Sequence, residues 1–308
     1  MKLNKIIDCP ICESTKTENM MQINCGGFDG SVLYKVISIN TCNNCGHIFN
    51  KLTSDDIEGL IKYYNTEYAP VNINASYKTG NKPGGEGNDA YIRYSKLYQF
   101  ISSFISPESK ILDVGCAMGG FLDFLNDKGF INLSGIDVTD DFLDYARQNK
   151  RYNIKVGSAD SIPFKENSFD LLTVNQVIEH LVSPSKVFQE AGRVLCEGGL
   201  LYIGVPDALR YGDDNPFDFY WLLIRDHIQH FDVEHLKLIA ELEGFELLNI
   251  NPNESLVLTP ELKMPSLDVI FRYTGKRNQL KITDNCFYLA ENFKEYLSLN
   301  LEKLKEKI

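Results

Sequence analysis

The chain has 308 residues, 44% of them apolar and 24% charged, which is typical of a folded protein built from one large domain and a small accessory module. Its net charge of −11 argues against nucleic acid as a partner, because an acidic surface repels phosphate. No apolar run is long enough to span a membrane, and the first residues lack the apolar core of a signal peptide. The sequence therefore predicts a cytoplasmic protein with no membrane partner.

Two cysteine pairs in the first fifty residues predict a metal site. The runs CPIC and CNNC, separated by 29 residues, contain Cys9, Cys12, Cys42 and Cys45. In a reducing compartment such pairs favour Zn²⁺ over disulfides, and four protein thiolates close the tetrahedron, so we expect a structural ion. We predict a zinc-binding module over residues 1–50. Cys25 and His47 are spare candidate ligands, and we favour Cys25 as a loop thiol and His47 as an imidazole at the surface or just outside the ligands.

Residues 51–109 are rich in tyrosine and are interrupted by the run KTGNKPGGEGN. Tyr63, Tyr64 and Tyr68 precede that run. Two interpretations stay open for them: a lid whose rings close over a ligand, or the packed face of an amphipathic helix between two domains. We predict a linker or lid followed by a leading helix.

From residue 110 onward, short apolar runs alternate with amphipathic stretches, which predicts βαβ units and a mostly parallel sheet. Strands are expected at 110–114, 132–137, 153–157, 169–174, 199–205 and 245–250. Helices are expected at 120–130, 139–150, 183–197 and 232–245, with Gly198 after the end of the third. This domain is predicted to cover 110–260. A C-terminal helical extension is predicted over 261–308, with an apolar face that packs on the domain or on a second subunit, so a monomer or homodimer is expected.

The first expected strand ends in a glycine-rich turn, within KILDVGCAMGGF (residues 110–121). Gly115, Gly119 and Gly120 let the backbone approach a ligand at the carboxyl ends of the strands, where open α/β sheets bind their ligands. The spacing G-x-x-x-G-G differs from the G-x-G-x-x-G of dinucleotide-binding turns, so NAD is not predicted. The second expected strand ends in Asp137, where an acid can accept hydrogen bonds from ribose hydroxyls.

Several runs in this order resemble class I S-adenosylmethionine-dependent methyltransferases over residues 110–250: LDVGCAMGG, SGID, GSADSIPF, NSFDLLTVNQVIEHL, EGGLLYIGVP and DHIQHFDVEHLKLIAELEGF. The resemblance implies an α/β, Rossmann-like fold, with a mostly parallel seven-stranded sheet and helices on both faces, and S-adenosyl-L-methionine as cofactor. It implies that the cofactor is bound by Asp113, Gly115, Cys116, Ala117, Gly119, Asn175 and Gln176 on the methionine side, by Asp137 with Val138 at the ribose, and by Ser158, Ala159 and Asp160 at the adenine. The chain has Ala117 where the family often has Gly, and Ser158 where the family often has an acid that Asp160 would replace.

A zinc module followed by a tyrosine-containing linker and this domain resembles methyltransferases of nucleotide-linked deoxysugars. That resemblance implies a small-molecule acceptor, with a nucleotide-activated sugar as the first candidate. Two alternatives stay open. One is an O-methyltransferase of a quinone- or polyketide-type metabolite, and the other is a zinc-bearing module that binds RNA or protein beside a weak or degenerate methyltransferase domain.

Histidine is the side chain best suited to take the acceptor's proton near neutral pH. His180 follows the fourth expected strand, and His227 and His230 follow the fifth, so these three are the candidate catalytic bases. His235 is interpreted as a solvated helix residue. The candidate substrate-facing and lid residues are Tyr63, Tyr64, Tyr68, Glu179, Tyr211 and Tyr220.

Overall fold

The computed structural model describes residues 9–26, 30–68, 89–148, 152–213, 220–259 and 262–306. The glycine-rich run KTGNKPGGEGN and the aromatic residues Phe217 and Phe219 lie outside the described residues, as does the side chain of Tyr220.

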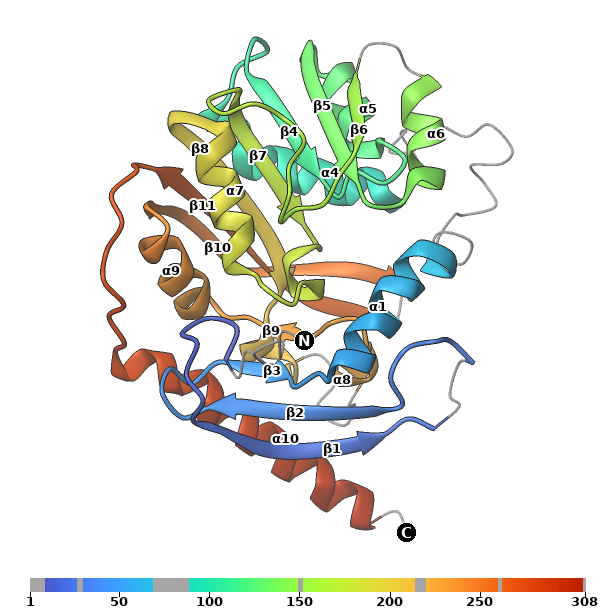
Figure 1. The fold of residues 1–308 in the computed structure, drawn as a ribbon, viewed down its shortest axis with the longest axis vertical. Helices are drawn as coiled ribbons and strands as arrows, with labels where there is room; N and C mark the ends of the chain where they lie inside the picture. The colour runs from blue at the N-terminus through green and yellow to red at the C-terminus, as the bar shows by residue number, and fades with distance from the viewer. Residues whose placement is uncertain are drawn as a thin grey trace, which may run out of the picture.

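A seven-stranded sheet forms the larger part of the molecule, in the order β10-β11-β8-β7-β4-β5-β6 (Figure 1). Its strands are β4 (Lys110–Val114), β5 (Asn132–Asp137), β6 (Asn153–Val156), β7 (Phe169–Asn175), β8 (Leu195–Pro206), β10 (Phe245–Thr259) and β11 (Leu262–Tyr273). The pairs from β8 to β6 are parallel, whereas β11 runs antiparallel to both β8 and β10. The predicted fold class, a Rossmann-like and mostly parallel seven-stranded sheet, is confirmed.

Helices cover both faces of this sheet because the central strands are apolar on both sides (Figure 1). The helices are α4 (Asp89–Ile101), α5 (Gly120–Asp127), α6 (Asp140–Gln148), α7 (Ser185–Val194) and α9 (Val233–Leu242). Ile111 packs in one core cluster with side chains of α4 and α5, and its neighbour Leu112 packs in another with side chains of α7 and α9. This alternation follows from the two-residue period of a strand.

Two predicted boundaries are corrected by the structure. The helix expected over 183–197 ends at Val194, and the next residues already belong to β8. The extension expected to be helical over 261–308 begins with β11, which completes the sheet; its helices are η4 (Asp284–Phe287) and α10 (Tyr288–Glu306). Alternating apolar residues in 262–273 carry the strand signal that the sequence analysis did not use.

A second, antiparallel sheet contains β1 (Thr17–Asn24), β2 (Val36–Cys42), β3 (Ile48–Asn50) and β9 (Gln229–His230). Strand β9 pairs with β3, although in the sequence it lies between β8 and β10 of the large sheet. Figure 1 shows this sheet at the lower end of the molecule, with α1 (Ser54–Thr66) between it and the large sheet. The predicted module of residues 1–50 therefore shares its sheet with a later segment, and the division into four regions stays a prediction.

The C-terminal helix α10 packs against the same chain. Leu289, Phe293 and Tyr296 lie in one core cluster with Ile37 and Ile39 of the small sheet. The sequence left open whether this helix packs on its own chain or on a second subunit. The described residues show packing on its own chain. The remaining short helices are η1 (Ser102–Phe104), η2 (Ile178–His180), η3 (Ala208–Arg210) and α8 (Tyr220–Leu223). In the described part of the chain, none of the helices has the length and apolar character that crossing a membrane requires.

Candidate functional site

A cavity of about 620 Å³ opens at the carboxyl ends of β4, β5, β6 and β7. This is the edge where open α/β sheets bind ligands. The predicted site residues that line it are Gly115, Ala117, Asp137, Val138, Ser158, Ala159, Asp160, Gln176, His180, Tyr64 and Tyr68. Further lining residues that the sequence analysis did not single out include Ile57, Leu60, Ile61, Phe142, Leu181, Val182 and Lys186.

The glycine-rich turn after β4 has the backbone conformation that its glycines suggested. Gly115 has φ +78°, and a Cβ there would collide with the side chain of Val177, so glycine is required for two independent reasons. Gly119 is also left-handed and precedes the first residue of α5. Ala117 has φ +44°, a conformation that costs more for alanine than for the glycine often found at this place in the resembling family.

Asp137 holds two loops of the cavity together. Its Oδ2 accepts a hydrogen bond from the backbone N–H of Ala117 at 3.0 Å, and its Oδ1 accepts one from the N–H of Thr139 at 2.9 Å. Burial raises the pKa of this carboxyl, and the backbone donors oppose that rise. Both loops are therefore fixed around one carboxylate that faces the cavity.

Asp113 lies behind the turn, outside the lining of the cavity. Its Oδ1 accepts a hydrogen bond from Thr173 Oγ1 at 2.7 Å, across the β4–β7 pair. Burial raises the pKa of Asp113 to about 7. Three other residues predicted to bind the cofactor, Cys116, Gly119 and Asn175, also lie outside the lining. The Cys116 thiol packs against Gly135, and the Asn175 amide oxygen accepts from the Tyr202 hydroxyl at 3.5 Å.

The loops after β6 and β7 form the opposite wall. Ser158 donates a hydrogen bond to Asp160 Oδ1 at 2.5 Å, so the residue that stands where the family often has an acid is bonded to an acid two positions later. Gln176 has φ +55°, and its backbone N–H is bonded to the carbonyl of Gly204 at 2.8 Å. Its side-chain nitrogen is buried and has no partner among the described residues.

The first helix of the chain forms the roof of the cavity. Ile57, Leu60, Ile61, Tyr64 and Tyr68 come from α1 and its C-terminal end, and they line one side of the cavity. The backbone carbonyl of Tyr64 accepts from the hydroxyl of Thr139 at 3.4 Å, and the Tyr64 hydroxyl donates to Asp226 Oδ2 at 3.2 Å.

The three tyrosines differ in their surroundings. Tyr68 lines the cavity, Tyr63 packs against the core cluster that contains the small sheet, and Tyr64 does both. The helical spacing of the apolar residues from 57 to 64 is the signal that could have found the other lining residues of α1.

One of the three candidate histidines reaches the cavity. His180, in the single turn η2 that follows β7, lines its wall. Its Nδ1 lies 2.9 Å from the backbone carbonyl of Asp226, so Nδ1 carries the proton of the neutral ring and Nε2 carries the lone pair. Glu179 is fully buried behind it, with Oε1 3.9 Å from His180 Nε2, and burial raises the pKa of Glu179 to about 7.

The other two candidate histidines lie deeper. His227 packs its ring edge-on against His180, with centroids 4.8 Å apart, and burial keeps its pKa well below the usual value. His230 lies in β9, bonded to Asn50 Oδ1 and to the hydroxyl of Tyr211, and burial lowers its pKa to about 3. The structure therefore places His227 beside the cavity wall. His230, in the small sheet, and Tyr211 are buried away from the cavity.

The four predicted zinc ligands converge. The Sγ atoms of Cys9 and Cys45 are 3.7 Å apart, those of Cys12 and Cys42 are 3.5 Å apart, and all four lie within 4.8 Å of one another. Four sulfurs at about 2.3 Å from one Zn²⁺ would be about 3.8 Å apart, so the residues present fit the ion. The cluster lies beside β2, and a Cβ on Gly46 would collide with the carbonyl of Cys286.

His235 contradicts the position expected for it, whereas His47 occupies one of the two positions expected for it. His235 was interpreted as solvated but is fully buried: Nδ1 lies 2.6 Å from Asp232 Oδ1, and Nε2 lies 2.9 Å from the backbone carbonyl of Cys45. The pKa of His235 is raised by Asp232, although burial opposes this. His47 is fully buried, so of its two expected positions it occupies the one just outside the ligands: its carbonyl accepts from the N–H of Cys42, and its Nε2 is bonded to Gln229 of β9. Both imidazoles tie the cysteine cluster to the large domain.

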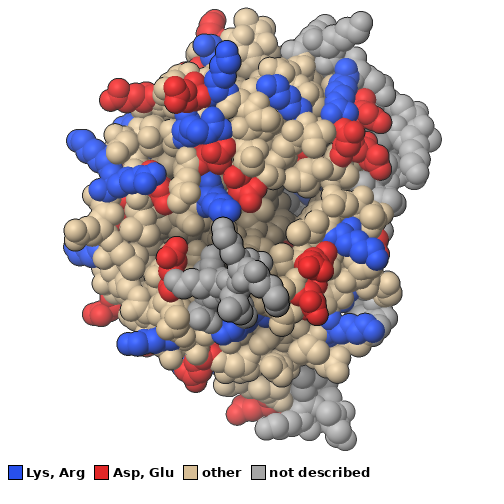
Figure 2. Space-filling model, viewed as in Figure 1, with Lys and Arg blue, Asp and Glu red and all other residues tan. Residues whose placement is uncertain are grey.

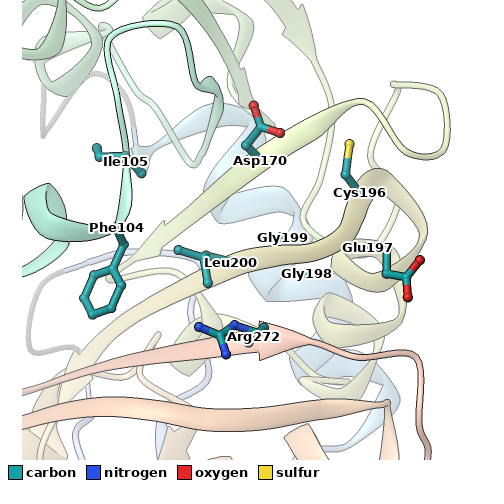
Figure 3. Close-up of a pocket in the computed structure, with 9 residues that line it drawn as sticks. All are labelled: Phe104, Ile105, Asp170, Cys196, Glu197, Gly198, Gly199, Leu200 and Arg272. Atoms are coloured by element: carbon teal, nitrogen blue, oxygen red, sulfur yellow. The ribbon is translucent and has the colours of Figure 1, made fainter.

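A second, smaller hollow of about 250 Å³ lies away from the main cavity, near the amino-terminal ends of β7 and β8 (Figure 3). Asp170 and Leu200 come from the amino-terminal parts of β7 and β8, and Arg272 comes from the end of β11. Because ligands of open α/β sheets bind at the carboxyl ends of the strands, this hollow is not the expected ligand site.

The face of the molecule in Figure 2 carries interspersed Lys and Arg with Asp and Glu side chains, without a broad basic area. Lys186 is the single cationic side chain among the described residues that line the main cavity. This face therefore lacks the continuous basic surface that usually binds an RNA backbone.

Comparisons with known proteins agree with this geometry. Residues 88–250 match a family model described as a methyltransferase domain. The ubiquinone/menaquinone biosynthesis C-methyltransferase UbiE of Campylobacter jejuni is 26% identical over 154 residues, 47% of this chain and 63% of that protein. The ubiquinone biosynthesis O-methyltransferase of Hydrogenovibrio crunogenus is 31% identical over 112 residues, 34% of this chain and 46% of that protein.

Among solved structures, this fold is similar to the complex between the Haloferax volcanii Trm112 methyltransferase activator and a putative methyltransferase. That match has a TM-score of 0.50 and 16% identity, and it covers 63% of this chain and 96% of the matched chain. The chain spans less than two thirds of the length of the two curated relatives.

Proposed function

The chain belongs to the class I S-adenosylmethionine-dependent methyltransferases, and from this premise we propose that it transfers a methyl group from S-adenosylmethionine to a small-molecule acceptor. The observation that carries the proposal is the cavity at the carboxyl ends of β4–β7, walled by the left-handed turn at Gly115 and by the carboxylate of Asp137. When bound there, the cofactor supplies a methyl group that its sulfonium already activates.

The residues present suit that cofactor. The turn from Gly115 to Gly119 would hold the methionine part, and Asp137 would accept from the ribose hydroxyls while it keeps its two backbone bonds. Val138 and Phe142, beside Ser158 and Asp160, would enclose the adenine between apolar surfaces. Asp113 supports the turn from behind, through its bond with Thr173.

His180 is the group that would take the acceptor's proton. Its Nδ1 donates to the carbonyl of Asp226, which leaves the lone pair of Nε2 available. When the acceptor receives the methyl group, Nε2 of His180 would take the proton that the acceptor loses. Apolar side chains of α1 exclude water from this step, which strengthens the electrostatic interactions inside the cavity.

The acceptor class follows from the lining. A nucleotide-activated sugar, the first candidate from the sequence, would need cations for its diphosphate, and the described lining offers Lys186. The apolar side chains Ile57, Ile61 and Leu181 instead suit a flat, apolar ring. The second candidate, a quinol- or polyketide-type hydroxyl, is favoured by this lining and by the name of one curated relative, an O-methyltransferase of ubiquinone biosynthesis. The other relative is named a C-methyltransferase of the same kind of pathway, so it supports a quinone-type ring without favouring its hydroxyl.

The four cysteines would hold one structural Zn²⁺. Since all four positions are protein thiolates, the ion would have no open position for substrate, and its contribution would be to the folding of the small sheet.

The test of cofactor binding is a calorimetric titration with S-adenosylhomocysteine. We expect the wild-type chain to bind, and Asp137→Ala to weaken binding by at least about tenfold, because two charge-assisted bonds and the ribose contact are lost. Asp144→Ala, at an exposed position of α6, is the matched control and should bind like the wild type. Equal binding by all three proteins would exclude the proposed site.

The acceptor is tested with two panels, one of nucleotide-linked sugars and one of quinols and polyketide phenols, with methyl transfer from labelled cofactor as the readout. His180→Ala should abolish transfer while it retains the affinity for S-adenosylhomocysteine. Transfer that survives in His180→Ala would remove this residue from the chemistry.

A further inference from the structure

Glu179 is a buried carboxylate that nothing in the described structure satisfies. Its side chain is 0% exposed, and both carboxyl oxygens lack a hydrogen-bond partner among the described residues. Oε1 of Glu179 lies 3.9 Å from Nε2 of His180, which is too long for a hydrogen bond. A buried carboxyl without a hydrogen-bond partner is unfavourable whether it ionises or stays neutral, so a native structure rarely keeps one without a reason.

The groups around Glu179 are metal ligands. One ligand atom each from Glu179, His180 and His227 lies within 4.8 Å of the other two. Two imidazoles and one carboxylate are a donor set that first-row divalent cations favour, with further positions left open.

The protonation of His180 agrees with such a role. Metal-ligating histidines usually donate their other ring N–H to a carbonyl or carboxylate, which fixes the tautomer. His180 does this, because Nδ1 lies 2.9 Å from the backbone carbonyl of Asp226 and 3.5 Å from Oδ2 of the same residue. Asp226 is itself held by the hydroxyl of Tyr64 at 3.2 Å. The lone pair of Nε2 is thereby directed to the side where Glu179 lies.

We propose that Glu179, His180 and His227 form a binding site for one first-row divalent cation at the wall of the cavity. Metal–ligand bonds to nitrogen and oxygen are about 2.0–2.2 Å, so ligand atoms on one ion lie roughly 3–3.5 Å apart. Side-chain rotations that close the present separations by about 1 Å bring the three atoms to one ion.

The cation would act on the acceptor. Since His180 lines the cavity, an open position of the ion faces the space beside the cofactor site. A hydroxyl bound there has a lower pKa and ionises near neutral pH. This inference rests on the proposed function and changes one step of it: Nε2 of His180 is then a ligand, and the acceptor's proton passes to water.

The test is Mn²⁺ binding to the full, zinc-loaded chain, followed by electron paramagnetic resonance and calorimetry. Mn²⁺ prefers nitrogen and oxygen donors, so it leaves the four thiolates to Zn²⁺. We expect one Mn²⁺ per chain in the wild type and at least a tenfold loss of affinity in Glu179→Gln. Glu246→Gln makes the same chemical change at an exposed ion pair with Arg272, and it should bind Mn²⁺ like the wild type.

Thermal unfolding separates loss of the site from loss of the fold. Mn²⁺ should raise the Tm of the wild type and of Glu246→Gln, and should leave the Tm of Glu179→Gln unchanged. Without metal, Glu179→Gln should be at least as stable as the wild type, because the substitution removes a buried charge that has no partner. A Glu179→Gln protein that is folded and binds Mn²⁺ with wild-type affinity overturns the proposal.

S-adenosylhomocysteine binding, measured on the same preparations, keeps the two proposals apart. If the chain binds S-adenosylhomocysteine and methylates an acceptor equally well with and without EDTA, and Mn²⁺ does not bind, the cation site is overturned and the proposed function stands. If Mn²⁺ binds through Glu179 but S-adenosylhomocysteine does not bind, the cation site is supported and the proposed function is overturned.

Discussion

At the scale of single residues, two aspartates near the cavity show how position on a strand decides the state of a carboxyl. Asp137 ends β5, where two backbone N–H groups of the following loops reach its oxygens. Asp113 lies one residue before the end of β4, and its carboxyl accepts a hydrogen bond from the hydroxyl of Thr173. Fewer donors in a buried setting explain why the pKa of Asp113 rises to about 7.

The raised pKa of Asp113 makes stability depend on pH. The folded state favours the neutral carboxyl, so its contribution is complete below the ordinary pKa of 3.8 and is lost as pH rises toward 7. Asp113→Asn keeps an oxygen for Thr173 and does not titrate. We therefore expect the free energy of unfolding of the variant, relative to the wild type, to increase between pH 4 and 7, by at most about 1.4 kcal/mol per pH unit.

Urea denaturation at pH 5 and pH 8 measures this difference. Asp144→Asn, at an exposed position on α6, controls for effects of the substitution on the unfolded chain. An Asp113→Asn difference that is the same at both pH values would contradict the assignment.

At the scale of elements, α1 shows how the fold turns an amphipathic helix into one wall of the cavity. The helix starts with a reciprocal capping box between Thr53 and Asp56, which stabilises its first turn. Ile57, Leu60, Ile61 and Tyr64 recur at helical spacing and so share one face. Leu60 is buried, but Ile61 is 58% exposed although it lines the cavity, which leaves an apolar side chain available for a ligand.

Ile61→Ser should therefore weaken acceptor binding with little effect on stability. We expect KM for an apolar acceptor to rise about three- to tenfold, since roughly 1 kcal/mol of apolar contact is lost, with Tm within about 2 °C of the wild type. Ile131→Ser changes an isoleucine that is 68% exposed and far from the cavity lining, and it should leave KM unchanged. Steady-state kinetics of the two variants decide whether α1 contacts the acceptor.

At the scale of the whole molecule, the cysteine cluster and the cavity wall are joined through the small sheet. His235 connects Asp232 to the carbonyl of Cys45, and Gln229 of β9 is bonded to His47. One residue before β9, the N–H of Ile228 donates to the carbonyl of Glu179 at 2.9 Å. The segment that carries His227 is therefore fixed at one end by the zinc module and at the other by the cavity wall.

Loss of one zinc ligand should then affect the reaction as well as the fold. For Cys42→Ser we expect Tm to fall by about 5–10 °C, and methyl transfer to fall by a larger factor than the affinity for S-adenosylhomocysteine, because β9 and His227 lose their support. Cys196→Ser alters a thiol outside the cluster and should change neither quantity. Thermal unfolding and transfer rates of the zinc-loaded proteins test this, and a Cys42→Ser protein with the wild-type Tm and zinc content would contradict it.

Local patterns in the sequence determined the alternation of strands and helices, the glycine-rich turn and the spacing of the cysteine pairs. These depend on short-range rules: the two-residue period of strands, the left-handed backbone of glycine, and the tight turn of a C-x-x-C pair. The same rules identified Asp137 at a strand end. They did not show that Gly115 must also clear Val177, because that contact joins residues far apart in the chain.

The tertiary structure alone decided which of the candidate residues meet. It selected His180 from three histidines, buried His235 against Asp232 and the cysteine cluster, and turned residues 262–273 into the antiparallel strand that completes the sheet. It also placed β9 beside β3, and it brought the carboxylate of Glu179 close to the imidazoles of His180 and His227. Each of these depends on long-range pairing and burial, and neither periodicity nor motif spacing along the chain carries that information.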